Sequence, residues 1–385
     1  MFDFDETINR RKSESLKWNT YPEDVIPMWV ADMDFQSPPA VLHALEERVK
    51  HGVFGYGVEE PGLRESVCTW VEKRYHWKID PSHMLFVPGV VTGLNWAVRQ
   101  LLKPGAKFII QTPVYPPFYQ VAQNADLCEI QIPLIKDEFG YYSQDIKAFE
   151  AAIDENTQGF ILCNPHNPVG RVFTKPELTQ VAEVCKKNNL IIFSDEIHGD
   201  LIYEGNVHVP IASIDSEISK HSVTLIAPSK TFNIAGLYCS VLICQNENLL
   251  SRLSAGRNGI VVEPNLLAQV AARAAYENGE GWLSEIMVYL DRNRRLISDF
   301  LKEEMPELKY SMPEGTFLGW IDCSELRIGE DPAEFFLREA RVAFSPGHIF
   351  GDTGKSFVRI NFGCTYATLI EVLERIKIAL RRKLN

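Results

Sequence analysis

The chain has 385 residues, of which 45% are hydrophobic and 23% are charged, a composition typical of ordinary globular proteins. This length exceeds the size at which a single hydrophobic core stops growing, so we expect two domains. The 51 acidic residues outnumber the 39 basic ones, and the formal charge of -12 provides no basic field for nucleic acid or acidic lipid. Nucleic-acid and membrane partners are therefore excluded from the expected functions.

The cysteines and the N-terminus indicate the expected compartment. Eight cysteines are spread along the chain without a CxxC pair, which favours reduced thiols over a zinc site or a disulfide framework. The first residues, Met1 to Glu6, lack the basic and apolar regions of a signal peptide, and no apolar run approaches membrane-spanning length. We expect a cytoplasmic protein without a metal site.

In chain order, the first clear element is a helix that begins near Pro39 and stops at Gly52. Short apolar runs then alternate with longer helical patterns up to Cys244. Such alternation predicts a mostly parallel sheet covered by helices. The apolar runs are Met84–Val87, Phe108–Ile110, Gly159–Cys163, Leu190–Phe193, Val223–Ala227 and Val241–Cys244.

The pattern changes after Trp282. A long helical stretch over 286–305 is followed by an apolar strand over 317–321, further helix, a strand near 357–360 and a basic C-terminal helix. This order predicts a second, smaller α+β domain. The expected fold class is therefore α/β, with a large sheet domain and a smaller α+β domain.

Three of the apolar runs end directly in unusual polar sequence. They lead into Asn164–Gly170, Ser194–His198 and Pro228–Lys230 respectively. Ligands of an open parallel sheet bind beyond the carboxyl ends of its strands, so these segments should converge on one edge. An asparagine, an aspartate and a lysine would then meet there.

A fourth motif, Pro88–Gly93, follows an apolar run and opens a helix. Free backbone N–H groups at a helix start suit a phosphate, and Thr92 adds a hydroxyl. The motif is neither GxGxxG nor a P-loop, so the dinucleotide and ATP interpretations lack their fingerprints.

Pyridoxal 5'-phosphate requires this combination of groups. Its aldehyde needs a lysine amine, its ring nitrogen a carboxylate, its phenolic oxygen a hydrogen-bond donor and its phosphate a cradle of N–H groups. Lys230, Asp195 and Asn167 could supply the first three, and Val91 with Thr92 the fourth.

At these residues the chain resembles the fold type I aminotransferase superfamily (class I/II), and within it the MalY/PatB-type cystathionine β-lyases or cysteine carbon–sulfur lyases. The resemblance covers almost the whole chain. It is carried by Met28–Phe35, Gly55–Gly57, Pro88–Thr92, Cys163–Pro168, Ser194–His198, Pro228–Asn233 and Val358–Asn361.

The resemblance implies a role for each matching residue. Lys230 would form the Schiff base, Asp195 would pair with the ring nitrogen and Tyr115 would stack on the ring. Arg359 would grip the substrate carboxylate with its planar fork. Further implied positions are Asn167 for the phenolic oxygen and substrate, Val91, Thr92, Ser229 and Tyr56 for the phosphate, His198 for the cofactor, and Val30 and Ala31 for the substrate cleft.

Two departures from general aminotransferases favour the lyase group. Tyr238 stands eight residues after the lysine, where many aminotransferases carry an arginine, and His198 stands where many carry a tyrosine. The resemblance thus implies α,β-elimination from a sulfur amino acid, giving a thiol, pyruvate and ammonia. Two alternatives stay open: an aminotransferase, and a regulator that senses the cofactor or a metabolite.

The family fold would place 51–284 in a large cofactor domain and 1–50 with 285–385 in a small one. It also implies a homodimer with shared active sites, in which Tyr56 reaches the neighbouring subunit's cofactor. The sequence does not identify the physiological substrate, because no residue spacing distinguishes a long cystathionine side chain from a short cysteine one.

Overall fold

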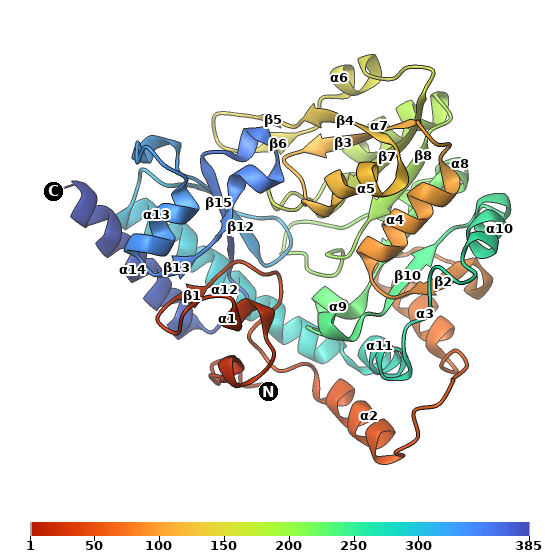
Figure 1. The fold of residues 1–385 in the computed structure, drawn as a ribbon, viewed down its shortest axis with the longest axis horizontal. Helices are drawn as coiled ribbons and strands as arrows, with labels where there is room; N and C mark the ends of the chain where they lie inside the picture. The colour runs from red at the N-terminus through yellow and green to blue at the C-terminus, as the bar shows by residue number, and fades with distance from the viewer. Residues whose placement is uncertain (1, 385) are drawn as a thin grey trace.

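The computed structural model describes residues 2–384 and contains a seven-stranded sheet beside a four-stranded one (Figure 1). The order of the large sheet is β2-β10-β9-β8-β7-β3-β4, and its neighbours from β9 to β4 run parallel. β10 runs antiparallel to both of its neighbours. The strands are β2 Met84–Val87, β3 Lys107–Thr112, β4 Cys128–Pro133, β7 Thr157–Cys163, β8 Ile191–Asp195, β9 Ser222–Ile226 and β10 Ser240–Ile243.

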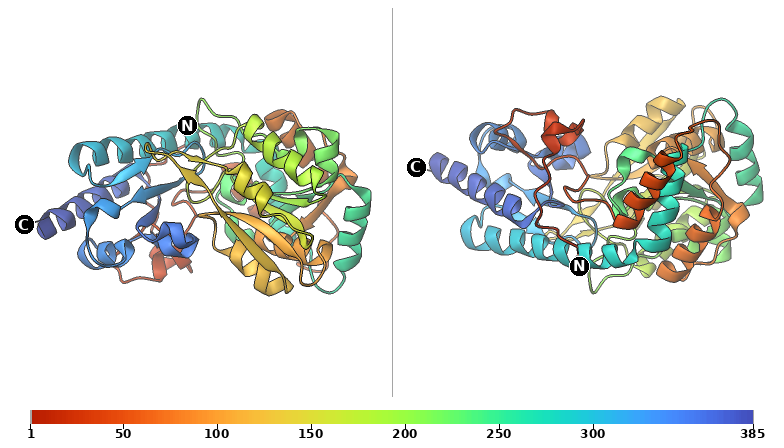
Figure 2. Two further views of the ribbon diagram at one scale, coloured as in Figure 1. Left: turned by 90° about the horizontal axis from the view of Figure 1, so that it is seen from above. Right: turned by 90° about the horizontal axis from the view of Figure 1, so that it is seen from below.

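Helices cover both faces of the large sheet (Figure 2). Successive side chains of a strand point to opposite faces, so Phe108 and Ile110 pack with α4 and α5, whereas Ile109 packs with α7. Both faces are buried, which explains the continuous apolar runs seen in the sequence. These helices are α4 Val90–Leu101, α5 Pro117–Ala125 and α7 Lys175–Lys187.

The smaller sheet has the order β11-β12-β15-β14 and is antiparallel. The N-terminal strand β1 pairs with β13, so both ends of the chain meet in this part of the molecule. The strands are β1 Ile26–Pro27, β11 Lys309–Ser311, β12 Leu318–Asp322, β13 Val342–Ala343, β14 Ser345–Pro346 and β15 Phe357–Asn361, with helices α13 Pro332–Glu339 and α14 Tyr366–Leu384.

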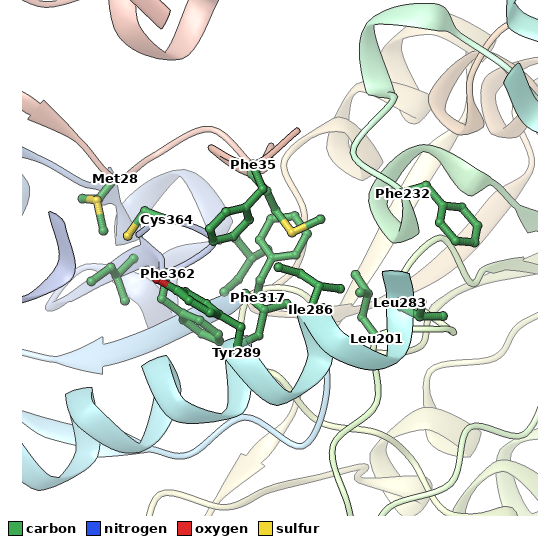
Figure 3. Close-up of a cluster of buried hydrophobic side chains, with 14 of the residues drawn as sticks. Met28, Phe35, Leu201, Phe232, Leu283, Ile286, Tyr289, Phe317, Phe362 and Cys364 are labelled. Carbon is green, nitrogen blue, oxygen red and sulfur yellow. The ribbon is translucent and has the colours of Figure 1, made fainter. Parts of the chain in front are cut away.

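The two sheets share a hydrophobic core along α12 (Glu280–Glu304), a helix that runs past both (Figure 1). Figure 3 shows Phe35, Phe232 and Phe317 in this cluster, contributed by the N-terminal segment, the large part and the small part. A continuous core of this kind fixes how groups on the two parts face each other.

The remaining elements complete the fold. They are α1 Leu16–Asn19, α2 Pro39–Lys50, α3 Leu63–Tyr75, α6 Ile146–Ala151, α8 Ser216–Lys220, α9 Pro228–Thr231, α10 Glu247–Gly256, α11 Leu266–Asn278 and the hairpin β5 Ile135–Lys136 with β6 Tyr142–Ser143. Among the described residues, no helix combines the length and the apolar character needed to cross a membrane.

Candidate active site

The carboxyl ends of β7, β8 and β9 lie side by side in the large sheet, as the polar motifs predict. Cys163 is in register with Asp195, which is in turn in register with Leu225. The segments that follow place Asn167, Asp195 and Lys230 around one pocket. Lys230 lies on the short helix α9, which begins at Pro228.

Asp195 is a buried carboxylate that forms no ion pair with any of the described residues. It is 4% exposed, and its Oδ1 accepts a hydrogen bond from the backbone N–H of Ile197 at 3.1 Å. Burial raises the pKa of Asp195 to about 7. A protonated pyridine nitrogen would supply the missing positive charge, so the carboxylate fits the cofactor.

Lys230 is the buried amine of the pocket. Its Nζ donates a hydrogen bond to the carbonyl oxygen of Ala31 at 2.5 Å. Burial lowers the pKa of Lys230 to about 8, so a substantial fraction of the amine is neutral near physiological pH. Only the neutral amine can attack an aldehyde or accept a proton from carbon.

The start of α4 provides the expected phosphate cradle. Gly89 precedes the helix with a φ of 106°, a backbone conformation that only glycine adopts without strain. No side chain caps the first turn, which leaves its N–H groups free for an anion. Val91, Thr92 and Ser229 line the pocket beside this turn.

Arg359 lies on β15 of the smaller sheet and is connected to the pocket by a hydrogen bond to Asn167, which lines it. Its Nη1 donates to Oδ1 of Asn167 at 3.0 Å, and its Nη2 donates to the carbonyl oxygen of Trp29 at 2.8 Å and to Oγ of Ser345 at 3.1 Å. Burial lowers the pKa of Arg359 to about 10, which still leaves it charged at neutral pH. A guanidinium in this place can bind a carboxylate bidentately.

His198 and Tyr115 complete the wall of the pocket. His198 is 3% exposed, its Nδ1 has no hydrogen-bond partner, and its ring packs edge-on against Phe317. Burial lowers the pKa of His198 well below its ordinary value, so the imidazole is neutral. Burial raises the pKa of Tyr115, whose phenol therefore stays protonated.

Most of the residues predicted from the sequence lie around this one pocket. Those that line it are Ala31, Val91, Thr92, Tyr115, Asn167, Asp195, His198, Ser229 and Lys230. Arg359 is one hydrogen bond away from it, and the carbonyl oxygen of Val30 accepts a hydrogen bond from Asn361. Tyr56 does not line the pocket, because it lies on a segment whose side chains are exposed.

Of the other lining residues, sequence reasoning had already named two and had assigned no role to two more. Gly89 and Tyr238 lie beside the phosphate cradle, and Cys163 and Cys239 contribute buried thiols. Gly89 belongs to the motif Pro88–Gly93, which was named from the sequence as the phosphate cradle. The two cysteines carry no pattern that separates them from ordinary core residues.

The fold and the pocket together define a fold type I enzyme that uses pyridoxal phosphate. Residues 23–376 match the model of the family "Aminotransferase class I and II". The chain therefore belongs to the aminotransferase class I and II family, and its cofactor is pyridoxal phosphate.

Relatives and solved structures agree over the whole length. The chain is 38% identical to "Cystathionine beta-lyase PatB" of Bacillus subtilis (strain 168), with 98% of this chain and 100% of that protein covered. The structure of a PLP-bound C-S lyase from Staphylococcus hominis superposes with a TM-score of 0.95 at 35% identity, with 100% of both chains covered. Cystalysin from Treponema denticola, which contains pyridoxal 5'-phosphate, gives the same TM-score, identity and coverage.

Proposed function

We propose that this chain cleaves the carbon–sulfur bond of a sulfur amino acid by α,β-elimination, which releases a thiol, pyruvate and ammonia. It is a pyridoxal-phosphate-dependent carbon–sulfur lyase of the cystathionine β-lyase kind. The observation that carries the proposal is one pocket lined by Lys230 and the buried Asp195, which the buried Arg359 reaches through a hydrogen bond to Asn167.

The pocket residues would each bind a different part of the cofactor. Asp195 would pair with the ring nitrogen, Asn167 and His198 would donate to the ring's oxygen, and Tyr115 would cover the ring face; all four line the pocket. Val91, Thr92 and Ser229, with the start of α4, would hold the phosphate. Bound pyridoxal phosphate supplies an electron sink for the charge left on the α-carbon when its proton departs.

The chain's own residues would bind and deprotonate the substrate. Arg359 would bind the α-carboxylate with its two terminal nitrogens, exchanging the carbonyl oxygen of Trp29 for a carboxylate oxygen. Ala31 would border the substrate beside it. The neutral Nζ of Lys230 would then accept the α-proton, and the sulfur would leave the β-carbon with its bonding electrons.

The nearest alternative is an aminotransferase, and the two activities differ in their products. Elimination releases pyruvate from L-cystathionine or L-cysteine without a keto-acid acceptor, whereas transamination requires one. Tyr238 and His198, which replace an arginine and a tyrosine of many aminotransferases, favour elimination. A regulator would bind the cofactor and turn over no amino acid.

The deciding experiment follows pyruvate and free thiol from a panel of sulfur amino acids. We expect release of both without a keto acid, and we expect Lys230→Ala to lose the visible absorbance of bound cofactor together with the activity. Lys187→Ala, which removes a lysine paired with Glu150 on the surface, is the matched control and should keep both. Turnover that strictly needs a keto-acid acceptor would refute the lyase proposal.

We also propose a homodimer with shared active sites, which the surface beside the cradle supports. Phe54, Tyr56 and Val58 are exposed residues of one segment, and Tyr56 is 112% exposed. A hollow that includes Val91 also contains Trp96, whose buried Nε1 lacks a hydrogen-bond partner. The Tyr56 segment of a second copy would cover this hollow, accept that hydrogen bond and bring Tyr56 to the phosphate.

Two further predictions accompany this function. We propose that 51–284 forms the cofactor domain and that 1–50 with 285–385 forms the small domain. The border lies within α12, so the parts would be joined by an unbroken helix. A cytoplasmic location stays a prediction from the sequence.

A further inference from the structure

The segment of residues 29–35, here called the bridging segment, lies between the lysine and the arginine of the site. On the lysine side, Lys230 donates to Ala31, and Nδ2 of Asn233 donates to the carbonyl oxygens of Met33 and Phe35 at 3.0 and 2.7 Å. Hydrogen bonds therefore link the position of this segment to the stretch of backbone that carries Lys230 and Asn233.

The other side of the bridging segment is held by β15. Nδ2 of Asn361 donates to the carbonyl oxygens of Val30 and Asp32 at 2.5 and 2.7 Å, and Arg359 donates to the carbonyl oxygen of Trp29. The backbone on both sides of Asp32 is thus fixed by side-chain hydrogen bonds.

Asp32 carries an unsatisfied carboxylate oxygen. Nη2 of Arg10 binds Oδ2 of Asp32 at 2.7 Å, but Oδ1 is buried and has no hydrogen-bond partner. Asp34, two residues later, is fully engaged by Arg10, Lys17 and Trp18. The two carboxylates therefore differ, since Asp32 keeps binding capacity for a further cation.

After Arg10, the cation linked to this part of the bridging segment is Lys230, which donates to the residue before Asp32. Burial lowers the pKa of Lys230, and the positive charge of Arg359 lowers it further. The negative charges of Asp32 and Asp195 raise this pKa, and Asp32 has the larger effect of the two. His198 also faces the lysine, and it is neutral because burial lowers its pKa. Among the charged groups around Lys230, Asp32 thus favours the ammonium form most.

We propose that Asp32, oriented by Arg10, is a positioning residue that holds the amine of Lys230 whenever that amine carries a proton. This inference rests on the proposed role of Lys230. In elimination the α-proton passes to Nζ, the α-carbon keeps the electron pair, and the new ammonium gains the attraction of Asp32. The same attraction delays attachment of the cofactor, because only the unprotonated amine attacks its aldehyde.

The test measures cofactor uptake instead of turnover. Pyridoxal phosphate is added at several pH values to the full chain from which it has been removed, and the return of visible absorbance is followed. In a plot of the uptake rate against pH, Asp32→Asn should lower the pH of the midpoint by about one unit. Uptake at pH 6 should therefore be about tenfold faster than in the wild type. At pH 9, where the amine is neutral in both, the rates should be equal. Asp32→Glu should restore the wild-type profile.

Asp34→Asn is the matched control, because it removes the same charge from the same segment. It should lower the midpoint of thermal unfolding without shifting the uptake profile. Asp32→Ser, smaller and also neutral, replaces Asp32→Asn if the amide variant does not fold. An unshifted profile in the neutral variants, or an equal shift in Asp34→Asn, would overturn the inference. A chain that shows the shift but cleaves no sulfur amino acid would refute only the proposed function.

Discussion

Asp195 and Lys230 carry opposite charges at the two ends of the expected cofactor site, and burial moves both toward their neutral forms. It raises the pKa of Asp195 to about 7 and lowers the pKa of Lys230 to about 8. The protonation state of each group can therefore be changed by a bound molecule. A protonated ring nitrogen would draw Asp195 into its charged form, and an aldehyde would consume the neutral amine of Lys230.

The raised pKa of Asp195 predicts a pH dependence of stability in the cofactor-free chain. In the unfolded chain this carboxyl titrates near pH 4, whereas in the folded chain it keeps its proton up to about pH 7. The folded state binds more protons between these values, so the contribution of Asp195 to stability is lost as pH rises from 4 to 7. Asp195→Asn, which stays neutral, should gain on the order of 4 kcal/mol over the wild type across this window.

Urea unfolding of the two cofactor-free proteins at pH 4.5 and pH 8 measures this difference. Other titrating groups are common to both proteins and cancel in the comparison. A difference in unfolding free energy that does not change with pH would show that Asp195 is already charged in the folded chain.

The residues of the site divide into those that the sequence could identify and those that it could not. Asp195 ends a strand, and Asn167 and Lys230 lie in the segments that follow two neighbouring strands, so strand topology alone predicts their meeting. Asp32 has no such signal, because its significance arises only from the packing of the bridging segment against Lys230. Contacts between segments 200 residues apart, such as Asn233 with Met33, leave no local pattern in the sequence.

At the scale of elements, the start of α4 carries the clearest local requirement. Gly89 has a φ of 106°, and a Cβ there would lie 3.6 Å from the ring of Tyr238. The side chain would fit, but the backbone would be strained by about 1–3 kcal/mol. Relaxing that strain would move the N–H groups of the first helical turn, which are the ones expected to hold the phosphate.

Gly89→Ala should therefore weaken the binding of pyridoxal phosphate about tenfold or more, as measured by fluorescence titration of the cofactor-free chain. Gly105→Ala is the control, because Gly105 also has a positive φ of 75° and open space around it but lies outside the pocket. Both variants should lose stability, and the control alone should keep its affinity. If Gly89→Ala and Gly105→Ala bound pyridoxal phosphate with equal affinity, the start of α4 would not be the phosphate cradle.

Strands buried on both faces were predictable, and those that depart from this pattern were not. β2 was predicted with its observed ends, because Met84–Val87 is a continuous apolar run. β4 was missed, since this edge strand is half exposed and mixes polar with apolar residues. The antiparallel direction of β10 is invisible in its sequence, because a strand buried on both faces looks alike in either direction.

At the scale of the whole molecule, two of the segments that carry exposed apolar side chains bear on the expected interface. Val53, Phe54, Tyr56 and Val58 belong to one, and Ile260 with Val262 to the other. Exposed apolar surface of this extent commonly marks an interface. The hollow beside Val91 includes Ile260, so the second segment borders the expected phosphate site.

A shared site predicts complementation between two inactive chains. Lys230→Ala lacks the amine, and Tyr56→Phe lacks the hydroxyl that would reach the neighbouring subunit's phosphate. A hybrid of the two contains one site in which both groups are intact, contributed by different chains. Random exchange of subunits in an equal mixture should therefore recover about a quarter of the wild-type activity, because half of the dimers are hybrids with one intact site each. If Tyr56 served its own chain, no hybrid site would contain both groups. The mixture would then be no more active than the average of its two components, measured as pyruvate release after exchange.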